Sequence, residues 1–339
     1  MKIRGIISEM PPGFGPIAGL RVGHAQDDAA LTGCTVFLCE SGMVGACEVL
    51  GGAAGERELE TLRPGHIVEK IHGLVLAGGS AFGLDAAAGV MRWCEERGIG
   101  FDAGVARVPI VPAAILFDLA IGSAARRPDA AMGYAAAQVA NEGPVEEGNV
   151  GAGTGATVGK LFGMTRAMKA GIGCWTEELR GGMRVAALAA VNAFGDIRDP
   201  TKGKIIAGAR AAADSWEFVD TAETMKSETV RPNFGGTSTV LVVVATDASL
   251  TKDEVQRVAK MASKGMERTI SPAFTKFDGD IVFALSAGDK SADVSVVGAA
   301  AAEAVARAIV RGVTQAETLA GVPGLKGRDQ RSEKSSRTS

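Results

Sequence analysis

The sequence predicts a layered α+β fold in which buried sheets are covered by alanine-rich helices. Hydrophobic residues make up 46% of the 339 residues, whereas aromatic residues make up only 5%, and there are 46 glycines. Small and β-branched side chains let backbones pack closely, which favours stacked sheets and helices over an aromatic-rich β-sandwich. Short β-branched runs also alternate with longer helical segments along the chain.

Six short apolar or β-branched runs predict the strands. Each run is bounded by Gly, Pro, Asp or Asn, which is typical of buried strands. The runs cover residues 35–38, 74–77, 108–116, 185–191, 240–246 and 281–285.

Four alanine-rich segments predict the helices, at residues 84–96, 130–141, 251–264 and 292–311. The third is the best specified, because Thr251 and Glu254 match the capping box of a helix start. Its apolar residues recur at the helical spacing i, i+3, i+4 and i+7, so one face of this helix should pack on a sheet. They are Val255, Val258, Ala259 and Ala262.

The chain shows no repeat of 20 to 50 residues and no Pro-rich or Ser-rich linker, which favours one compact domain over residues 1–325. The polar stretch from Asp214 to Gly236 predicts an exposed loop. Residues 326–339 contain no apolar side chain and predict a disordered tail.

Composition excludes several classes of partner and site. A net charge of -3 argues against nucleic acid and favours a small-molecule substrate. The five cysteines are scattered and form no C-x-x-C pair, so neither a disulfide framework nor a zinc site is expected. Without a secretory signal or an apolar run of about 18 residues, a cytoplasmic protein outside the membrane is expected. The histidines show no metal-ligand spacing, and no cofactor is expected; they are His24, His66 and His72.

A candidate nucleophile lies in the segment GGTSTVLVVVATD, residues 235–247, where hydroxyl residues run directly into a strand. No histidine is well placed to serve as the base of a serine triad. A hydroxyl residue here could instead attack the peptide carbonyl before it and cut its own chain. The amine released by the cut would then act as the base, because an α-amine has a pKa of about 7.7 to 8.0.

Two glycine-rich turns are further candidates. In NVGAGTGATVGK, residues 149–160, Thr154 and Leu161 break the phosphate-loop pattern, and the dinucleotide fingerprint lacks a preceding strand. What remains is Lys160, a cation that could face an oxyanion. In LAGGSAFG, residues 76–83, Ser80 does not match the nucleophile elbow and predicts a helix N-cap, although N–H groups at Gly78, Gly79 and Ser80 could bind a substrate carboxylate.

Three polar residues beside predicted strands have both a structural and a functional interpretation. Asp278 and Asp280 could form a solvated turn, or could point the same way from an extended segment and orient a new ammonium group. Asn192 could cap its strand, or could aim its amide at developing negative charge.

Taken together, these segments resemble the DmpA-type L-aminopeptidase/D-esterase peptidase family, which includes relatives that hydrolyse nylon oligomers and β-peptides. The resemblance extends from Gly19 to about Gly312. It is carried by GLRVGHA at Gly19, LAGGSAFGLDAAAGV at Leu76, VPIVPAAILFDL at Val108, GNVGAGTGATVGK at Gly148, AVNAFGD at Ala190, STVLVVVATDA at Ser238 and FDGD at Phe277.

The resemblance implies a four-layer αββα sandwich and an enzyme that matures by cutting itself between Ser238 and Thr239, giving fragments 1–238 and 239–339. It implies that the N-terminal Thr239 attacks short peptides, amides or esters, and that the processed units form a homo-oligomer. The family's lysine and asparagine fall on Lys160 and Asn192, and its acidic pair falls on Asp278 and Asp280.

Three positions depart from the family pattern. Many relatives have Asn or Gly where this chain has Ser238, and a second Thr where it has Val240, so the cut could precede Ser238 instead. Some relatives carry a tyrosine near the oxyanion, where this chain has Phe117, a further candidate for substrate binding. Two other functions stay open: an acyltransferase like the similarly folded ornithine acetyltransferases, and an unprocessed binding protein with the same fold.

Overall fold

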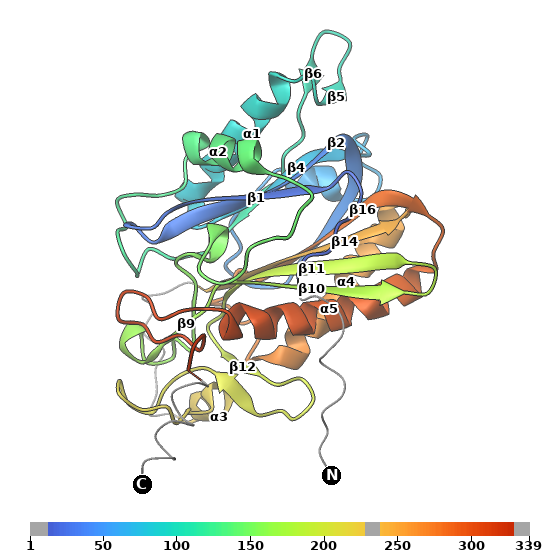
Figure 1. Cartoon of the computed structure of the whole chain (residues 1–339). Coiled ribbons are helices and arrows are strands. Elements are labelled where there is room, and N and C mark those ends of the chain that lie inside the picture. The colour runs from blue at the N-terminus through green and yellow to red at the C-terminus, as the bar shows by residue number, and fades with distance from the viewer. Residues whose placement is uncertain (1–12, 228–237, 329–339) are drawn as a thin grey trace.

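Two stacked β-sheets, each covered on its outer face by two helices, form the body of the protein (Figure 1). The structure is a computed structural model that describes residues 13–227 and 238–328. The order of the layers is helices, sheet, sheet, helices, as the family resemblance implied.

One long strand connects the two sheets. β2 (Thr32–Val49) has 18 residues; its first part pairs with one set of strands and its last part with another, on either side of an irregularity between Leu38 and Met43. Gly42 lies in this irregularity with φ 74, a left-handed conformation that favours glycine. β2 therefore passes from one layer to the next.

The upper sheet in Figure 1 contains the first part of β2 with the strands β1 (Arg21–Asp27), β4 (Ile71–Ala77), β7 (Ala113–Ile115) and β3 (Glu56–Arg57). The lower sheet contains the last part of β2 with β16 (Ile281–Lys290), β14 (Thr239–Ala248), β11 (Met183–Asn192) and β10 (Ile172–Leu179), in that order. β14 and β16 are parallel neighbours at the centre of this path.

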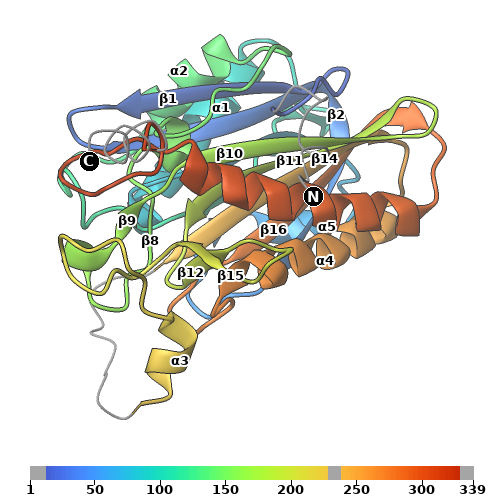
Figure 2. The same ribbon diagram turned by 60° about the horizontal axis from the view of Figure 1, so that its bottom comes forward.

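Two helices cover each outer face. α1 (Ala86–Glu95) and α2 (Ala130–Val139) pack on the upper sheet, and α4 (Lys252–Thr269) and α5 (Val294–Thr314) pack on the lower sheet. Figure 2 shows α4 and α5 side by side along the lower sheet. α4 begins with the predicted capping box, because Thr251 and Glu254 each bond the other's backbone N–H.

Three apolar clusters fill the spaces between the four layers. β14 contributes to two of them, because its side chains alternate between the two faces of the sheet. Val240, Val242 and Val244 join the cluster under α4 and α5, whereas Leu241 and Val243 join the cluster between the sheets. Burial on both faces explains why this strand reads as a continuous β-branched run.

The remaining elements are short. The small strands are β5 (Phe101–Asp102), β6 (Arg107–Val108), β8 (Thr157–Val158), β9 (Met168–Lys169), β12 (Asp196–Arg198), β13 (Ile205–Ala207) and β15 (Ile270–Ser271). Single-turn 3-10 helices lie at Leu59–Leu62, Ser80–Asp85, Gly151–Gly153 and Met164–Arg166. The helix α3 (Thr221–Met225) precedes the segment that leads to β14.

Most of the predicted elements are confirmed, with two corrections. The predicted strand at residues 108–116 is wrong, since β6 ends at Val108 and β7 begins only at Ala113. Pro109 and Pro112 stand between the two strands and lack the N–H that a strand needs. The loop predicted at 214–236 contains α3, and its residues 228–236 lie outside the described residues.

The C-terminal prediction needs a later boundary. Lys326 donates its backbone N–H to the carbonyl of Ala316, and its side chain forms an ion pair with Glu317. Arg328 stacks on the ring of Trp216. Residues 326–328, assigned to the tail, are thus bound to the body, and residues 329–339 lie outside the described residues.

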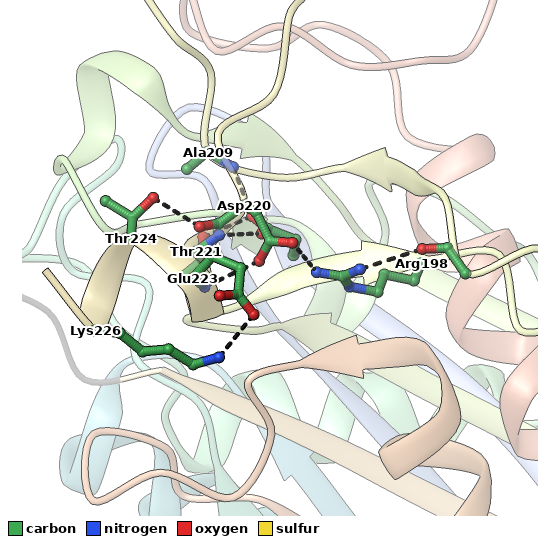
Figure 3. Close-up of polar contacts among 9 residues, drawn as sticks. Arg198, Ala209, Asp220, Thr221, Glu223, Thr224 and Lys226 are labelled. Carbon is green, nitrogen blue, oxygen red and sulfur yellow. Dashed lines mark hydrogen bonds and ion pairs between the residues drawn. The ribbon is translucent and has the colours of Figure 1, made fainter.

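α3 is fastened to β12 by buried polar contacts (Figure 3). Asp220 caps α3 by accepting the N–H of Glu223, and it forms an ion pair with Arg198 at 2.6 Å. Asp196 is fully buried and accepts both the N–H and the hydroxyl of Thr221, each at 2.7 Å. These contacts therefore hold α3 in place against β12.

Among the described residues the cysteines are free thiols, and no three His, Cys, Asp or Glu side chains are grouped as metal ligands. None of the helices placed in residues 13–227 and 238–328 combines the length and the apolar character that crossing a membrane requires.

Candidate active site

Ends of three neighbouring strands bring the candidate residues together. Asn192 is the last residue of β11 and lies opposite Thr239, the first residue of β14. Ser238 forms a parallel bridge with Asp278, three residues before β16 begins. Pairing of the strands thus assembles residues that are far apart in the sequence.

The hydroxyl of Thr239 lies next to the peptide carbonyl that it would attack. Its Oγ1 donates to the carbonyl oxygen of Ser238 at 2.7 Å, and the same oxygen accepts the N–H of Gly279 at 2.7 Å. Ser238 and Thr239 are both buried. A backbone N–H on this carbonyl is the arrangement that stabilises negative charge developing on the oxygen.

Gly279 leaves room for this hydroxyl. A Cβ atom on Gly279 would lie 2.7 Å from Oγ1 of Thr239 and 2.8 Å from the carbonyl oxygen of Ala53. Real side chains essentially never approach that closely, so only glycine fits between the two carboxylate-bearing residues of this turn.

The N–H of Thr239 points toward β11. The next N–H along the strand, that of Val240, donates to Oδ1 of Asp280 at 2.7 Å, on the β16 side. Successive N–H groups of a strand alternate in direction, so the nitrogen of Thr239 faces its register partner Asn192.

Lys160 reaches this point from the glycine-rich loop. Its Nζ donates to Oδ1 of Asn192 at 2.7 Å, to the carbonyl oxygen of Asn192 at 3.0 Å and to Oγ of Ser238 at 3.3 Å. Burial lowers the pKa of Lys160 to about 7, and three carboxylates oppose this shift; they belong to Asp278, Asp118 and Asp280. Both the charged and the neutral amine are therefore accessible near neutral pH.

Asn192 is fixed by contacts to every polar atom of its side chain. Oδ1 accepts from Lys160 and from the N–H of Thr157 at 3.1 Å, and Nδ2 donates to the carbonyl oxygen of Phe117 at 2.9 Å. Phe117 thus contributes its backbone carbonyl to the site. Asn192 is fully buried, so its amide is held in one orientation.

The acidic pair is buried, which excludes the solvated-turn interpretation. Asp278 accepts from Thr275 and from the N–H of Phe194, whereas Asp280 accepts the N–H groups of Val240 and Phe274. Burial together with the charge of Asp278 raises the pKa of Asp280 to about 8. Burial also raises the pKa of Asp278.

The second glycine-rich turn is engaged elsewhere. The N–H of Gly78 donates to the carbonyl of Gly33, that of Gly79 to Oδ1 of Asp118, and that of Ser80 to the carbonyl of Leu116. These N–H groups are therefore not available to a substrate carboxylate in this structure. The N-cap prediction for Ser80 is wrong, because Ser80 is the first residue of a 3-10 helix capped by Gly79, which has φ 80.

Two buried charged residues near the site were missed by sequence reasoning, Asp118 and Lys169. A lone acidic residue in the apolar run ILFDL was the available signal for Asp118. Thr157 and Gly279 contribute only backbone N–H groups, and a backbone contact leaves no signal in residue type.

Comparison with known proteins identifies the family. The model of peptidase family S58 matches residues 16–326. The chain belongs to peptidase family S58. An uncharacterized aminopeptidase of Mycobacterium tuberculosis is 40% identical over 337 residues, which cover 91% of this chain and 95% of the relative. The 6-aminohexanoate-oligomer endohydrolase of Agromyces sp. is 31% identical over 271 residues, covering 79% and 73% of the two chains.

Solved structures show the same fold as this S58 member. The L-aminopeptidase D-Ala-esterase/amidase of Ochrobactrum anthropi, described as a variant of the Ntn (N-terminal nucleophile) hydrolase fold, superposes with a TM-score of 0.71 at 18% identity, covering 98% of both chains. A Burkholderia sp. β-aminopeptidase gives a TM-score of 0.68 at 24% identity, covering 95% of this chain and 94% of that one. The predicted αββα fold and DmpA-type family are confirmed, and the protein is a hydrolase of peptidase family S58.

Proposed function

We propose that this S58 peptidase cuts itself between Ser238 and Thr239 and then removes N-terminal residues from short peptides, aminoacyl amides or esters. One observation carries the proposal: Oγ1 of Thr239 lies 2.7 Å from the carbonyl oxygen of Ser238, and that oxygen already accepts the N–H of Gly279. Nucleophile, target and oxyanion donor are adjacent before any cut is made.

The first cut needs a base other than an α-amine, because Thr239 is still in peptide linkage. Lys160 in its neutral form is the candidate, since burial lowers its pKa to about 7 and it lies beside the residue that precedes the scissile bond, with Nζ 3.3 Å from Oγ of Ser238. Oγ1 of Thr239 attacks the carbonyl carbon of Ser238, the C–N bond breaks, and the nitrogen of Thr239 takes up the proton. Water then hydrolyses the resulting ester and leaves a carboxylate on Ser238 and a free amine on Thr239.

Turnover reuses the same groups on a substrate carbonyl. The new α-amine of Thr239 takes the proton from Oγ1 and returns it to the leaving amine or alcohol. Asn192 and the charged form of Lys160 stabilise the tetrahedral intermediate, and Asp278 with Asp280 position the amine. Water then releases the acyl group from Thr239.

The names of the relatives support the substrate class. The names of the uncharacterized aminopeptidase of Mycobacterium tuberculosis and of the 6-aminohexanoate-oligomer endohydrolase both denote cleavage of amide bonds. An amide bond is thus the chemistry that the two names share. Processed units of this chain are expected to assemble into a homo-oligomer.

Intact-mass measurement of the purified protein tests the proposal. The wild type should give two fragments that together account for the chain plus one water, with the second fragment starting at Thr239. Thr239→Ala should stay whole and inactive, whereas Ser238→Ala should still be cut at the same bond. An uncut wild type that hydrolyses aminoacyl amides would overturn the proposal, and a second fragment starting at Ser238 would move the nucleophile to that residue.

A further inference from the structure

Asp118 is a buried carboxylate beside the site that the proposed reaction does not use. Its side chain is 4% exposed. Oδ1 accepts the N–H of Gly79 at 2.7 Å, and Oδ2 accepts the hydroxyl of Thr32 at 2.7 Å. Burial raises the pKa of Asp118, and these two hydrogen bonds together with the charge of Lys169 act in the opposite direction.

Asp118 lies where three segments meet. It ties the start of β2, through Thr32, to the turn after β4, through Gly79. Glycines make room for it: a Cβ atom on Gly78 would lie 2.1 Å from its Oδ2, and one on Gly155 would lie 2.6 Å from its Cβ. Gly155 belongs to the loop that carries Thr157 and Lys160, so Asp118 packs directly against the loop that supplies the site.

Asp118 directly follows Phe117, whose backbone carbonyl contacts the side chain of Asn192. The carbonyl of Phe117, the residue before Asp118, accepts Nδ2 of Asn192 at 2.9 Å. Because both carboxylate oxygens of Asp118 are anchored, the Phe117 carbonyl is held against the Asn192 amide.

The charge of Asp118 acts on two lysines, the half-buried Lys160 and the buried Lys169. It raises the pKa of Lys160 and that of Lys169, and in both lysines burial acts in the opposite direction and is larger. Lys169 is fully buried and donates to carbonyls of the same loop, at 2.7 Å to Ala156 and 3.4 Å to Gly153. The loop is therefore held by Lys169 and by Asp118, and their charges stabilise each other.

We propose that Asp118 is a positioning residue of the active site, which fixes the Phe117 carbonyl against Asn192 and packs against the glycine-rich loop that carries Lys160. This inference rests on the proposed function. In this role Asp118 contacts neither the substrate nor the reacting atoms. The pH range in which the enzyme is active would then depend on a carboxylate outside the acidic pair of Asp278 and Asp280.

The inference predicts effects of opposite sign on the two reactions. Removing the charge of Asp118 lowers the pKa of Lys160, so that more Lys160 is neutral at a given pH. The first cut uses neutral Lys160 and should become faster below pH 7. Turnover uses charged Lys160, so kcat/KM falls at high pH as Lys160 loses its proton. This fall, the alkaline limb of the pH profile, should move to lower pH in the variant. Asp278 and Asp280 also face Lys160 and are unchanged in the variant.

Asp118→Asn tests this, because the amide keeps the size and can still accept from Gly79. The matched control is Thr32→Ser, which removes a methyl group beside Asp118 but keeps the hydroxyl that donates to it, and so leaves its charge. Both should be compared with wild type for the rate of the first cut at pH 6, followed by intact mass, and for kcat/KM of an aminoacyl p-nitroanilide against pH.

For Asp118→Asn we expect an alkaline limb lower by at least about half a pH unit, a loss of about threefold in kcat/KM above the limb, and a faster first cut at pH 6. Thr32→Ser should keep the wild-type limb. Identical limbs in wild type and Asp118→Asn, or the same shift in both variants, would overturn the inference. A wild type that is never cut would instead overturn the proposed function.

Asp118→Glu provides a second measurement if Asp118→Asn does not fold. It keeps the charge but moves the carboxylate by one methylene, which disturbs the Phe117 carbonyl. An unchanged alkaline limb with a lower kcat would support the positioning role, and a limb shifted to lower pH would contradict it.

Discussion

At the scale of single residues, the candidate site depends on backbone groups as much as on reactive side chains. Gly279 supplies the N–H that contacts the Ser238 carbonyl, Thr157 supplies an N–H to Asn192, and Phe117 supplies a carbonyl to the same amide. These backbone groups are already oriented in the folded chain. Little reorganisation is therefore needed when charge develops on the carbonyl oxygen of Ser238.

Gly279→Ala should block the first cut. Gly279 does not have a positive φ, so its backbone conformation is open to alanine, but the added methyl would lie 2.7 Å from Oγ1 of Thr239 and 2.8 Å from the carbonyl oxygen of Ala53, so the turn has to shift. We expect the cut to slow by about 100-fold or more, as when an oxyanion donor is displaced. Intact mass over time measures the rate. Gly73→Ala is the control, since its methyl would meet its nearest neighbour at 3.2 Å, and a normal rate in Gly279→Ala would contradict the steric argument.

At the scale of elements, the position of α3 is set by a buried carboxylate rather than by the helix itself. A helix of 5 residues has little stability of its own, and its start is bound to β12 through Asp196. Asp196 also accepts the N–H of Ala209, so one side chain joins three segments.

Asp196→Ala should release α3. The change leaves the N–H groups of Thr221 and Ala209 without their acceptor, at a cost of about 1–3 kcal/mol for each buried group left unsatisfied. Hydrogen exchange should therefore accelerate in residues 221–226 more than in β14. Thr251→Ala, which removes the cap of α4, is the control and should cost about 1 kcal/mol without affecting α3. Unchanged exchange at α3 would show that Asp196 does not hold it.

The same variant has a defined pH signature. Burial raises the pKa of Asp196 to about 6, above the ordinary value of 3.8. A carboxyl whose pKa is raised in the folded state favours folding below pH 3.8, and this contribution is lost as pH rises to about 6. The stability difference between wild type and Asp196→Ala should therefore shrink as pH rises between those values.

At the scale of the whole molecule, the two fragments expected from the cut share one sheet and one core. β14 and β16 would belong to the second fragment, yet they lie between β11 and β2, which belong to the first. The apolar cluster under α4 and α5 likewise combines residues from both sides of the cut. Neither fragment can bury its apolar surface without the other.

The fragments should consequently stay together after the cut. We expect the processed protein to elute at the same volume as uncut Thr239→Ala and to separate into two fragments only in guanidinium. The uncut variant should unfold at a higher temperature, because an intact chain has less freedom in the unfolded state. Size-exclusion chromatography with intact mass and thermal unfolding measure these outcomes. Fragments that elute separately in native buffer would contradict the shared core.

The sequence by itself determined the elements and the kinds of reactive residue. The β-branched run before Asp247 predicts a buried strand, and Thr251 with Glu254 specifies the start of α4, because these signals are local in the chain. The candidates Thr239, Lys160 and Asn192 were predicted from residue type and from family resemblance. Both depend on short segments of sequence.

Only the tertiary structure decided which of these residues meet and in what electrostatic state. Strand pairing places Asn192 opposite Thr239, and burial changes the pKa values of Lys160 and Asp280. The role of Asp118, the engaged N–H groups after β4 and the break at Pro109 likewise depend on partners distant in the chain. Hydrogen bonds and burial are properties of neighbours in space, and a linear pattern records only neighbours in sequence.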